Sequence, residues 1–452
     1  MADLDVLRGL IEKISDGATE RRRLNAYYDG EKRLEALGIT LPPEMRRLAV
    51  VVNWPRLAIR SLEERLDVEG FRLAGEPRVS ERLWEWWQAN NLDTRGPLGH
   101  KEALVTGDAY IVVGRRDGDD ETPLITVESG AHLHADIDPG TGEVRSAGRV
   151  YAADDNGVPQ RAALYLPDVT LLYELRAGSG FREVDAVEHE LGTVPVVPML
   201  HADRLDDVGG RSDMLDIIGL TDACCRTLTN LGGAQELLAV PQRYVLGATA
   251  GDFQNTDGTA KTAWEAYIGR ILALGNEDAK VGQFTAADLR NFTEVINQYS
   301  KLVSAMTGLP PHYLGYSTEN PTSADAIRSS ESRLVKRAER VGTQFADAWE
   351  SALRIALRWI DDTDDVPRLE TRWRDPSTPT FAAKADAVTK LVQAGIIPKE
   401  AAWDALGYSQ EQQAHYAQLM ASDPLAALIR SVGADGAQQP AAVAAAPATV
   451  EE

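Results

Sequence analysis

The sequence predicts an α+β protein in which helices surround an antiparallel β region. Apolar residues recur every three or four positions through much of the first 70 residues and again after residue 212, as they do in amphipathic helices. Between about 104 and 200 they alternate at every second residue, and Asp-Gly, Pro-Gly and Asn-Gly pairs mark hairpin turns. Helical spacing from Thr322 continues for about 39 residues, against roughly a dozen for an average helix. The chain is therefore expected to contain one unusually long helix.

The N-terminal residues are expected to form an amphipathic helical arm that Gly17 interrupts. The apolar positions with helical spacing are Leu4, Leu7, Leu10 and Ile14 before Gly17, and Ile59, Leu62 and Leu66 after Pro42-Pro43. A further helix ends near Asn90–Asn91 and carries Trp84, Trp86 and Trp87. Indole rings in such a cluster are expected to fill a core or an interface rather than to hold a ligand.

Residues 104–200 are expected to form hairpins. The alternating runs are Ala109–Val113, Ile125–Val127, Arg149–Ala152, Ala163–Leu166 and Val169–Leu175. The turn from Asp136 to Glu143 has some likeness to a calcium-binding loop, but it lacks the ligand spacing and the twelfth-position Glu of that motif. A simple hairpin is the prediction there.

Two helices of similar reach are predicted on either side of a compact insertion. Ser212 is placed to cap the first, which runs to Leu238. Residues 239–286 lose helical periodicity and hold a strand-like Tyr244–Leu246, and the second helix runs from Ala287 to about Met306. Gly308 and Pro310-Pro311 end it, because glycine favours the left-handed cap and proline cannot continue a helix.

A polar loop, 312–321, leads into the longest helical pattern. Thr322 and Asp325 form a start that is similar to a capping box, with Asp in the place of Glu. Residues 361–365 are mostly acidic and end this helix, and Leu369–Trp373 alternates like a strand. Helical spacing returns over 380–421, and the Ala-rich residues after it are expected to be disordered.

Composition excludes several classes of protein. The 452 residues are 44% hydrophobic, which is sufficient for folded cores, and 47 Lys and Arg against 69 Asp and Glu give a net charge of −22. That charge argues against a broad basic surface that coats nucleic acid. The two cysteines, Cys224 and Cys225, are adjacent, so we expect no disulfide framework and a reducing compartment. No signal peptide or membrane-spanning run is predicted.

Motifs for catalysis are absent from the sequence. Gly258–Thr262 ends like a phosphate-binding loop but lacks the glycine before its lysine, and no GxSxG, HExxH or CxxC motif occurs. His132 and His134 share one face of a strand without a third ligand nearby, which is weak support for a metal. Acids are too numerous for any pair to indicate acid–base catalysis. We therefore predict no catalytic residue, no cofactor and no metal.

A series of short motifs runs along most of the chain, and each is a turn or a cap with a local physical reason to exist. They are Tyr27-Tyr-Asp-Gly30, Asn53-Trp-Pro55, Thr106-Gly-Asp-Ala-Tyr110, Asp138-Pro-Gly-Thr-Gly142, Leu191-Gly-Thr-Val-Pro195, Gly210-Arg-Ser-Asp213, Thr307-Gly-Leu-Pro310, Tyr313-Leu-Gly315 and Thr322-Ser-Ala-Asp-Ala-Ile327. In their order and spacing these motifs resemble those of one family, the portal proteins of tailed double-stranded-DNA bacteriophages, especially long non-contractile-tailed phages of Gram-positive hosts.

The resemblance implies a portal fold and assigns a part of it to each segment. The order is a wing with a helical arm and a β-rich region at 1–208, a first stem helix at 209–238, a clip at 239–286, a second stem helix at 287–307, a channel loop at 308–322, a long helix with a returning strand at 323–375, a helical crown at 376–421, and a low-complexity, disordered tail at 422–452.

The resemblance also implies the function and the partners. Portal subunits form a homo-oligomeric ring, typically a dodecamer, at one capsid vertex of the virion, after assembly in the host cytoplasm. Double-stranded DNA passes through the ring during packaging and ejection, and DNA is retained there. The implied protein partners are the large terminase, a head-completion adaptor, and the major capsid and scaffold proteins, without a membrane.

Three groups of residues are candidates for these contacts. Around the channel loop, the candidates for DNA contact are Tyr313, Tyr316, Ser317, Thr318, Glu319 and Asn320. In the clip, the candidates for terminase or adaptor docking are Gln242, Arg243, Tyr244 and Trp264. For subunit contacts the candidates are Arg333, Lys336, Arg337 and Arg340, and pairing within one chain is an equally weighted alternative for these four.

An electronegative channel wall is a further expectation. The segments that would form the tube carry −3 over 213–238, −1 over 239–286, zero over 287–306 and −1 over 308–322, a net charge of −5 per chain. Cations along the wall would bind phosphates and slow the passage of DNA.

Two other kinds of protein remain as alternatives. One is an acidic cytoplasmic hydrolase whose carboxylates lie apart in the sequence, and it would elute as a monomer or small oligomer. The other is a capsid or scaffold protein, which would form shells rather than rings. An assembly of several hundred kilodaltons with an axial hole would separate a portal from both.

Overall fold

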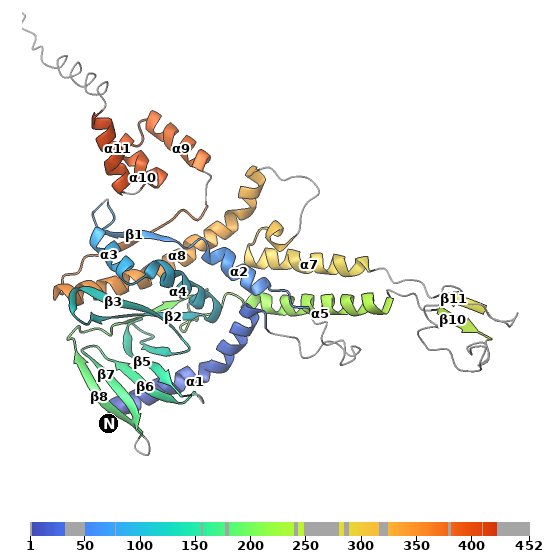
Figure 1. Ribbon diagram of the computed structural model, residues 1–452, viewed down its shortest axis with the longest axis horizontal. Helices are drawn as coiled ribbons and strands as arrows, with labels where there is room; N and C mark the ends of the chain where they lie inside the picture. The colour runs from blue at the N-terminus through green and yellow to red at the C-terminus, as the bar shows by residue number, and fades with distance from the viewer. Residues whose placement is uncertain are drawn as a thin grey trace, which may run out of the picture. The chain divides into compact units, whose positions relative to one another are not determined.

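The computed structural model of the chain (Figure 1) divides into two units, Met1–Ser377 and Thr378–Glu452. The first unit combines helices with antiparallel strands, so the predicted α+β class is confirmed. The structure describes residues 2–31, 50–76, 78–154, 157–176, 180–238, 243–247, 280–283, 289–315, 324–377, 381–408 and 410–422.

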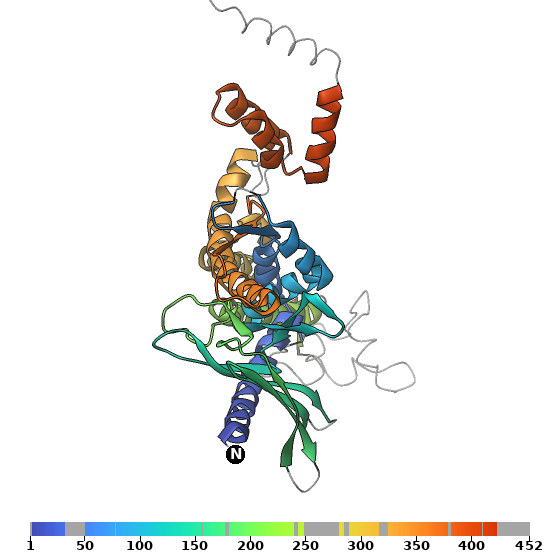
Figure 2. The same cartoon turned by 90° about the vertical axis from the view of Figure 1, so that its left-hand side faces the viewer.

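The N-terminal arm is one unbroken helix, α1 (Ala2–Asp29), and the predicted interruption at Gly17 is wrong. A side chain at Gly17 would lie 2.3 Å from Arg21 Nη1. Glycine therefore leaves room for Arg21 to fold back and bond the Ile14 carbonyl and the Asp108 carboxylate. The helix packs its buried Leu7 and Leu10 against Leu164 and Tyr173 of the β region. Figure 2 shows the helix from the side, lying along a sheet.

Three short helices follow, namely α2 (Trp54–Glu63), α3 (Glu81–Ala89) and α4 (Leu92–Thr106). The Asn53 side chain caps α2 by accepting from Arg56 N at 3.0 Å. The sequence did not predict α4, because Pro97 and two glycines lie within it. Gly96 fits against the Trp87 ring, where a Cβ would come within 3.1 Å, so tertiary packing compensates for poor helix propensity.

Two larger sheets form the β region. The three-stranded sheet has the order β3-β2-β9, with β2 (Asp108–Arg116), β3 (Asp119–Ser129) and β9 (Val196–Leu200). The five-stranded sheet runs in sequence order through β4 (Leu133–Ile137), β5 (Val144–Ala153), β6 (Pro159–Tyr165), β7 (Val169–Arg176) and β8 (Gly180–Glu188). The hairpin at Asp138 is confirmed, since Asp138 Oδ1 accepts from Gly140 N and Thr141 N.

The long helix α8 (Ala324–Asp361) has 38 residues and supplies one wall of the main core. Its Trp349 packs edge-on against Trp87 at 4.8 Å between ring centroids, and its Phe345 is fully buried. The predicted strand β12 (Leu369–Trp373) is confirmed, and it pairs antiparallel with β1 (Val68–Leu73), which the sequence did not predict.

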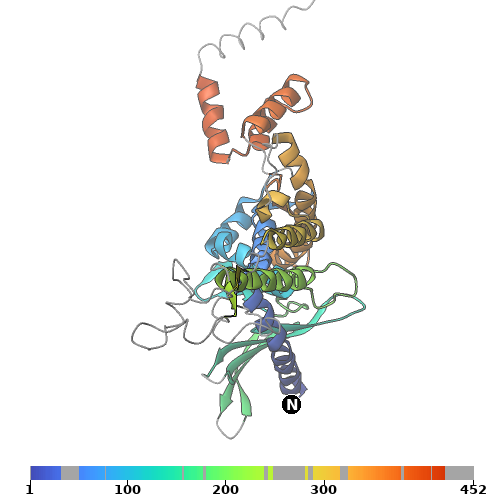
Figure 3. The ribbon, with the colours of Figure 1, turned by 90° about the vertical axis from the view of Figure 1, so that its right-hand side faces the viewer.

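The helices α5 (Leu215–Leu238) and α7 (Arg290–Thr307) lie side by side and project from the rest of the first unit (Figures 1 and 3). At their far end β10 (Arg243–Leu246) pairs antiparallel with β11 (Lys280–Gln283). The 3₁₀-helix η3 (Pro311–Leu314) follows α7. We call α5, α7 and the strand pair the helical hairpin.

The described part of the second unit contains α9 (Phe381–Gln393), α10 (Lys399–Leu406) and α11 (Gln410–Ser422). Its buried apolar side chains among these residues are Val388 and Ala402. The predicted disordered tail lies outside the described residues, apart from Ser422 itself.

Candidate functional site

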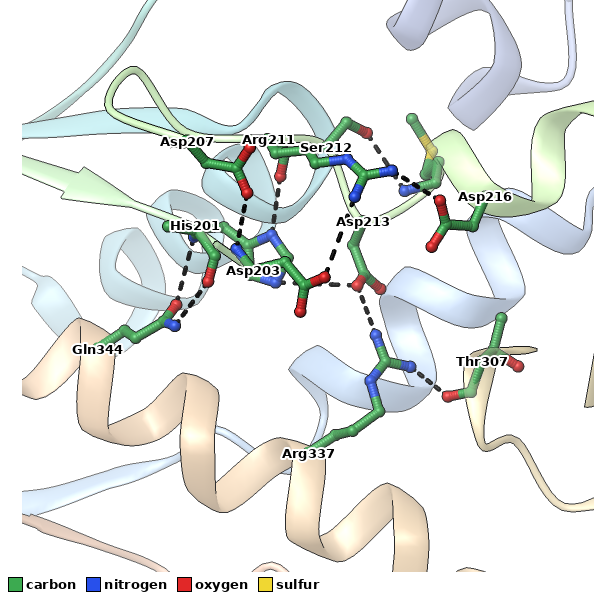
Figure 4. A network of polar contacts seen from close by, with 12 residues as sticks. His201, Asp203, Asp207, Arg211, Ser212, Asp213, Asp216, Thr307, Arg337 and Gln344 are labelled. Atoms are coloured by element: carbon green, nitrogen blue, oxygen red, sulfur yellow. Dashed lines mark hydrogen bonds and ion pairs between the residues drawn. The ribbon is translucent and has the colours of Figure 1, made fainter. Parts of the chain in front are cut away.

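The inner ends of the helical hairpin meet α8 at a joint made largely of polar groups (Figure 4). Arg337 of α8 points between the two hairpin helices. Its Nη2 donates to Asp213 Oδ1 at 2.5 Å, and its Nη1 donates to the carbonyl oxygen of Thr307. Asp213 lies just before α5, and Thr307 is the last residue of α7. One guanidinium therefore fixes both hairpin helices to the body of the subunit.

The C-terminal end of α7 is suited to receive such cations. Its last carbonyls have no partner within the helix and carry a partial negative charge. Gly308 ends the helix in the left-handed conformation with φ of 74°, and Arg333 Nη1 donates to the Ala305 carbonyl. Arg333 and Arg337 thus satisfy carbonyls that α7 leaves free, and they complement its dipole.

A second set of bonds joins the segment after β9 to the same joint. His201 Nδ1 donates to the Arg211 carbonyl at 2.8 Å, because a carbonyl oxygen only accepts, and this leaves Nε2 3.8 Å from Asp213 Oδ1. Arg211 pairs with Asp216 at 2.7 Å. The Gln344 amide of α8 donates to the Ala202 carbonyl at 2.8 Å and accepts from Ala202 N at 3.4 Å. The first turn of α5 is therefore positioned by three separate segments.

Two glycines allow the backbones to approach each other at this joint. A Cβ on Gly210 would lie 2.0 Å from the Gly107 carbonyl oxygen, and both residues have positive φ, +104° at Gly107 and +81° at Gly210. No side chain other than hydrogen fits there. The motifs Thr106–Tyr110 and Gly210–Asp213, which the sequence showed only as separate turns, are in direct contact.

A smaller cluster lies at the base of the residues that join η3 to α8. The Tyr313 hydroxyl donates to Glu331 Oε1 at 3.1 Å and accepts from Arg65 Nη2 at 3.2 Å. Arg65 pairs with Glu331 at 3.4 Å and also donates to the Pro376 carbonyl. The Arg65 side chain is only 8% exposed. Tyr313 is half-buried, and its hydroxyl is engaged within the chain.

Comparison with known proteins decides the family. The family model described as phage portal protein, SPP1 Gp6-like, matches residues 11–422. The chain belongs to this phage portal protein family. The portal protein of Mycobacterium phage L5 is 42% identical over 416 residues, covering 89% of this chain and 85% of that one. The portal protein of Mycobacterium phage D29 is 43% identical over 413 residues, covering 88% and 85%. The resemblance seen in the sequence is therefore confirmed.

Solved structures give weaker likenesses. A chain in the virion of a native gene transfer agent particle has a TM-score of 0.46 and 14% identity, with 85% of this chain and 99% of that chain covered. A chain in the neck of the native particle, computed with C12 symmetry, has a TM-score of 0.39 and 15% identity, with 81% and 93% covered.

The predicted portal sites are only partly described by the structure. Among the candidates in the channel loop, Tyr313 lies in η3. The other candidates are outside the described residues, namely Tyr316, Ser317, Thr318, Glu319 and Asn320. In the clip, Arg243 and Tyr244 belong to β10, and Gln242 and Trp264 are outside the described residues. The roles of both groups stay predictions.

Three of the four arginine and lysine candidates for subunit contacts have partners within their own chain. Arg333 and Arg337 bind the end of α7, and Lys336 pairs with Glu339 at 2.5 Å. Within the subunit these three residues therefore form intrachain contacts, as the alternative predicted. Arg340 is exposed on α8. A contact between portal subunits through these residues stays a prediction.

The described residues contain neither a candidate metal site nor a reactive thiol. Among them no group of three or more His, Cys, Asp and Glu side chains is arranged to hold a metal ion. Cys224 and Cys225 are buried and free, and burial raises the pKa of the Cys224 thiol to about 12. A thiol with that pKa stays protonated and is a poor nucleophile. No described helix combines the length and the apolar character that crossing a bilayer requires.

Proposed function

We propose that the chain is the subunit of a phage portal, a ring at one capsid vertex through which double-stranded DNA enters and leaves. The family match over residues 11–422 carries this proposal, supported by the two mycobacteriophage relatives named portal protein. Portal proteins are structural, and in this proposal the subunit performs no reaction. ATP hydrolysis belongs to the terminase, since the sequence has no phosphate-binding loop.

The exposed face of α7 supports assembly into a ring. Val295, Leu302 and Met306 are 41%, 40% and 48% exposed and are spaced seven and four residues apart, so they share one face of the helix. An apolar stripe of this kind on a projecting helix suits burial against a neighbouring copy. A closed ring requires one face of a subunit to meet a different face of the next, repeated until the rotation closes. We propose a ring of twelve subunits, the number typical of the family.

The first test is the assembly itself. The purified full chain is expected to elute as an assembly of several hundred kilodaltons, and negative-stain electron micrographs are expected to show rings with an axial hole. A chain that stays monomeric at high concentration, or that forms shells, would contradict the proposal. Rings would also separate a portal from an acidic hydrolase and from a scaffold protein.

The channel loop is proposed to touch DNA by weak polar and aromatic contacts, within a conduit of net negative charge. Deleting 316–320 removes the candidate side chains but keeps Tyr313 bonded to Arg65 and Glu331. The variant is expected to form rings and to package or retain DNA poorly. A matched control replaces the same five residues with Gly and Ser, which keeps the loop length but removes the side chains. Normal packaging by both variants would reject the role of the loop.

The clip is proposed to dock the large terminase and later the head-completion adaptor. A ring that lacks 247–262 is expected to lose binding of the purified large terminase. The adaptor gives an independent readout on the same variant. Undiminished binding of both partners would reject the clip as the docking site.

A further inference from the structure

The loop between β9 and α5 carries the most exposed large apolar residue among those described. Leu205 is 100% exposed at the tip of residues 203–208, and Val208 of the same loop is 52% exposed. Single apolar residues on a surface are common and need no explanation. What distinguishes Leu205 is the rigidity of the loop that presents it.

Asp207 holds the loop in one conformation. Its Oδ2 accepts from Asp203 N at 3.1 Å and from Arg204 N at 2.9 Å, and its backbone N–H donates to the Arg204 carbonyl at 3.1 Å. At the base of the loop, Arg211 N donates to the His201 carbonyl at 2.7 Å. A side chain on a preorganised loop loses little conformational entropy when it is buried by a partner. Leu205 is therefore positioned as an anchor for an interface.

A cavity of about 260 Å³ with an apolar lining lies elsewhere on the same unit. Leu66, Ala338, Gly342, Trp373 and Pro376 contribute to its walls. The lining also includes two bases, Arg65 and Arg374, and two acids, Glu339 and Asp375, so its formal charges balance. The loop thus offers an apolar tip, and the cavity offers apolar walls without a net charge.

The loop and the cavity lie on opposite sides of α8. Gln344 holds the base of the loop at Ala202, whereas Gly342 lines the cavity. Two positions along an α-helix correspond to a rotation of about 200°. None of residues 203–208 lines the cavity of its own chain. Two different surfaces on opposite sides of one subunit are the arrangement that a heterologous ring contact needs.

We propose that Leu205 of one copy inserts into the cavity beside Trp373 of the next copy, and that this contact helps to close the ring. The inference rests on the proposed portal ring, and it identifies the occupant of the cavity as a second copy of this chain.

The first experiment measures assembly of full-length Leu205→Asp by size-exclusion chromatography and mass photometry over a range of concentrations. In the proposed contact Leu205 is buried, and a charged residue in its place would be costly to bury. The concentration at which half of the chains are assembled is therefore expected to rise at least about tenfold. Val158→Asp, at a 44% exposed valine in a different turn, is the matched control and should assemble like the parent. Because Leu205 makes no buried contact within its chain, the thermal midpoint of the unassembled subunit should not change.

The second experiment tests the pairing directly with Leu205→Cys and Gly342→Cys in one chain. A Cβ at Gly342 would lie 3.6 Å from the Trp373 ring, an ordinary contact, and the native Cys224 and Cys225 are buried. Oxidised rings are expected to give a ladder of covalent multimers on a non-reducing denaturing gel, and each single cysteine variant should give none.

The outcomes separate the two proposals. Parent rings without a ladder, or a product that stops at a dimer, would overturn the insertion of Leu205 and leave the portal ring standing. Parent-like assembly of Leu205→Asp would overturn it as well. A parent chain that forms no ring would overturn the proposed function, and the inference would fall with it.

Discussion

The helices α7 and α8 have the same kind of amphipathic sequence and use it differently. From Leu334 onward α8 buries its apolar face in the core of its own subunit, with Phe345 and Trp349 fully buried. The buried residues of α7 are Ser300, Val303 and Thr307, all in its second half, while the stripe of Val295, Leu302 and Met306 is exposed. An amphipathic pattern thus predicts that a helix has an apolar face. It does not predict whether the partner of that face belongs to the same chain.

The largest expected effect is the loss of the α8 core. Trp349→Ala should lower the free energy of unfolding by about 3–5 kcal/mol, because it leaves a cavity beside Trp87 and removes the bond from Trp349 Nε1 to His100. Urea unfolding of the unassembled chain, followed by tryptophan fluorescence and circular dichroism, measures it. Arg354→Ala, on the exposed side of α8, should change the value by less than about 0.5 kcal/mol. Equal effects of the two variants would refute the assignment of this face to the core.

A somewhat smaller effect is expected at the joint, where α8 and α7 meet. Arg337→Gln leaves the Asp213 carboxylate, whose side chain is 9% exposed, without its Arg337 partner and the Thr307 carbonyl without this donor, so we expect a loss of about 2–3 kcal/mol. Lys336→Gln, next to it but 65% exposed, should cost less than about 0.5 kcal/mol. The same unfolding measurement distinguishes the two, and a joint that tolerates Arg337→Gln would argue that packing alone positions the hairpin.

The third prediction concerns acid sensitivity of the core behind α8. His100 is fully buried, and its Nε2 accepts from Trp349 Nε1 at 2.9 Å. Burial lowers the pKa of His100 to about 3, well below the roughly 6.5 of an unfolded chain. The folded state therefore holds His100 neutral, and its contribution to stability is complete above pH 6.5 and is lost as the pH falls toward 3.

Urea titrations at several pH values test this. Between pH 6.5 and 5 the parent should lose about 1.5 kcal/mol more than His100→Gln, whose amide still accepts a hydrogen bond but does not titrate. Carboxylates contribute equally to both proteins and cancel in the difference. Parallel pH profiles would show that His100 does not control the acid response.

The smallest effect on folding is expected on α7. Leu302→Gln, in the exposed stripe, should change the free energy of unfolding of the subunit by less than about 0.5 kcal/mol. Sedimentation velocity at matched concentrations should nevertheless show weaker assembly. Leu98→Gln, at another exposed leucine on α4, serves as the control and should alter neither quantity. A large loss of subunit stability in Leu302→Gln would mean that the stripe is covered within the chain.

The sequence predicted the long helix well, because helical spacing and a cap both mark it. The observed α8 begins at Ala324, two residues after the predicted start at Thr322. Sequence reasoning did not predict α4, because its Gly96 and Pro97 disfavour a helix until Trp87 packs against the glycine. Sequence reasoning also did not predict β8. Residues 182–188 of this strand are exposed on both faces, so apolar and polar residues do not alternate along it.

The candidate site was only partly accessible to sequence reasoning. Helical spacing placed Arg333 and Arg337 on one side of a helix, but their partners at the end of α7 are about 30 residues away in sequence and lie near only after folding. The contact between Gly107 and Gly210 has the same origin. A glycine in a turn indicates positive φ, and it does not reveal which backbone approaches it.

The cluster around Arg65 has a mechanical consequence. Tyr313 and Glu331 stand on either side of residues 316–323, and both bond to this one buried guanidinium. Arg65 also donates to the carbonyl of Pro376. A pull on residues 316–323 would therefore load Tyr313, Glu331 and the Pro376 carbonyl together, through a single side chain.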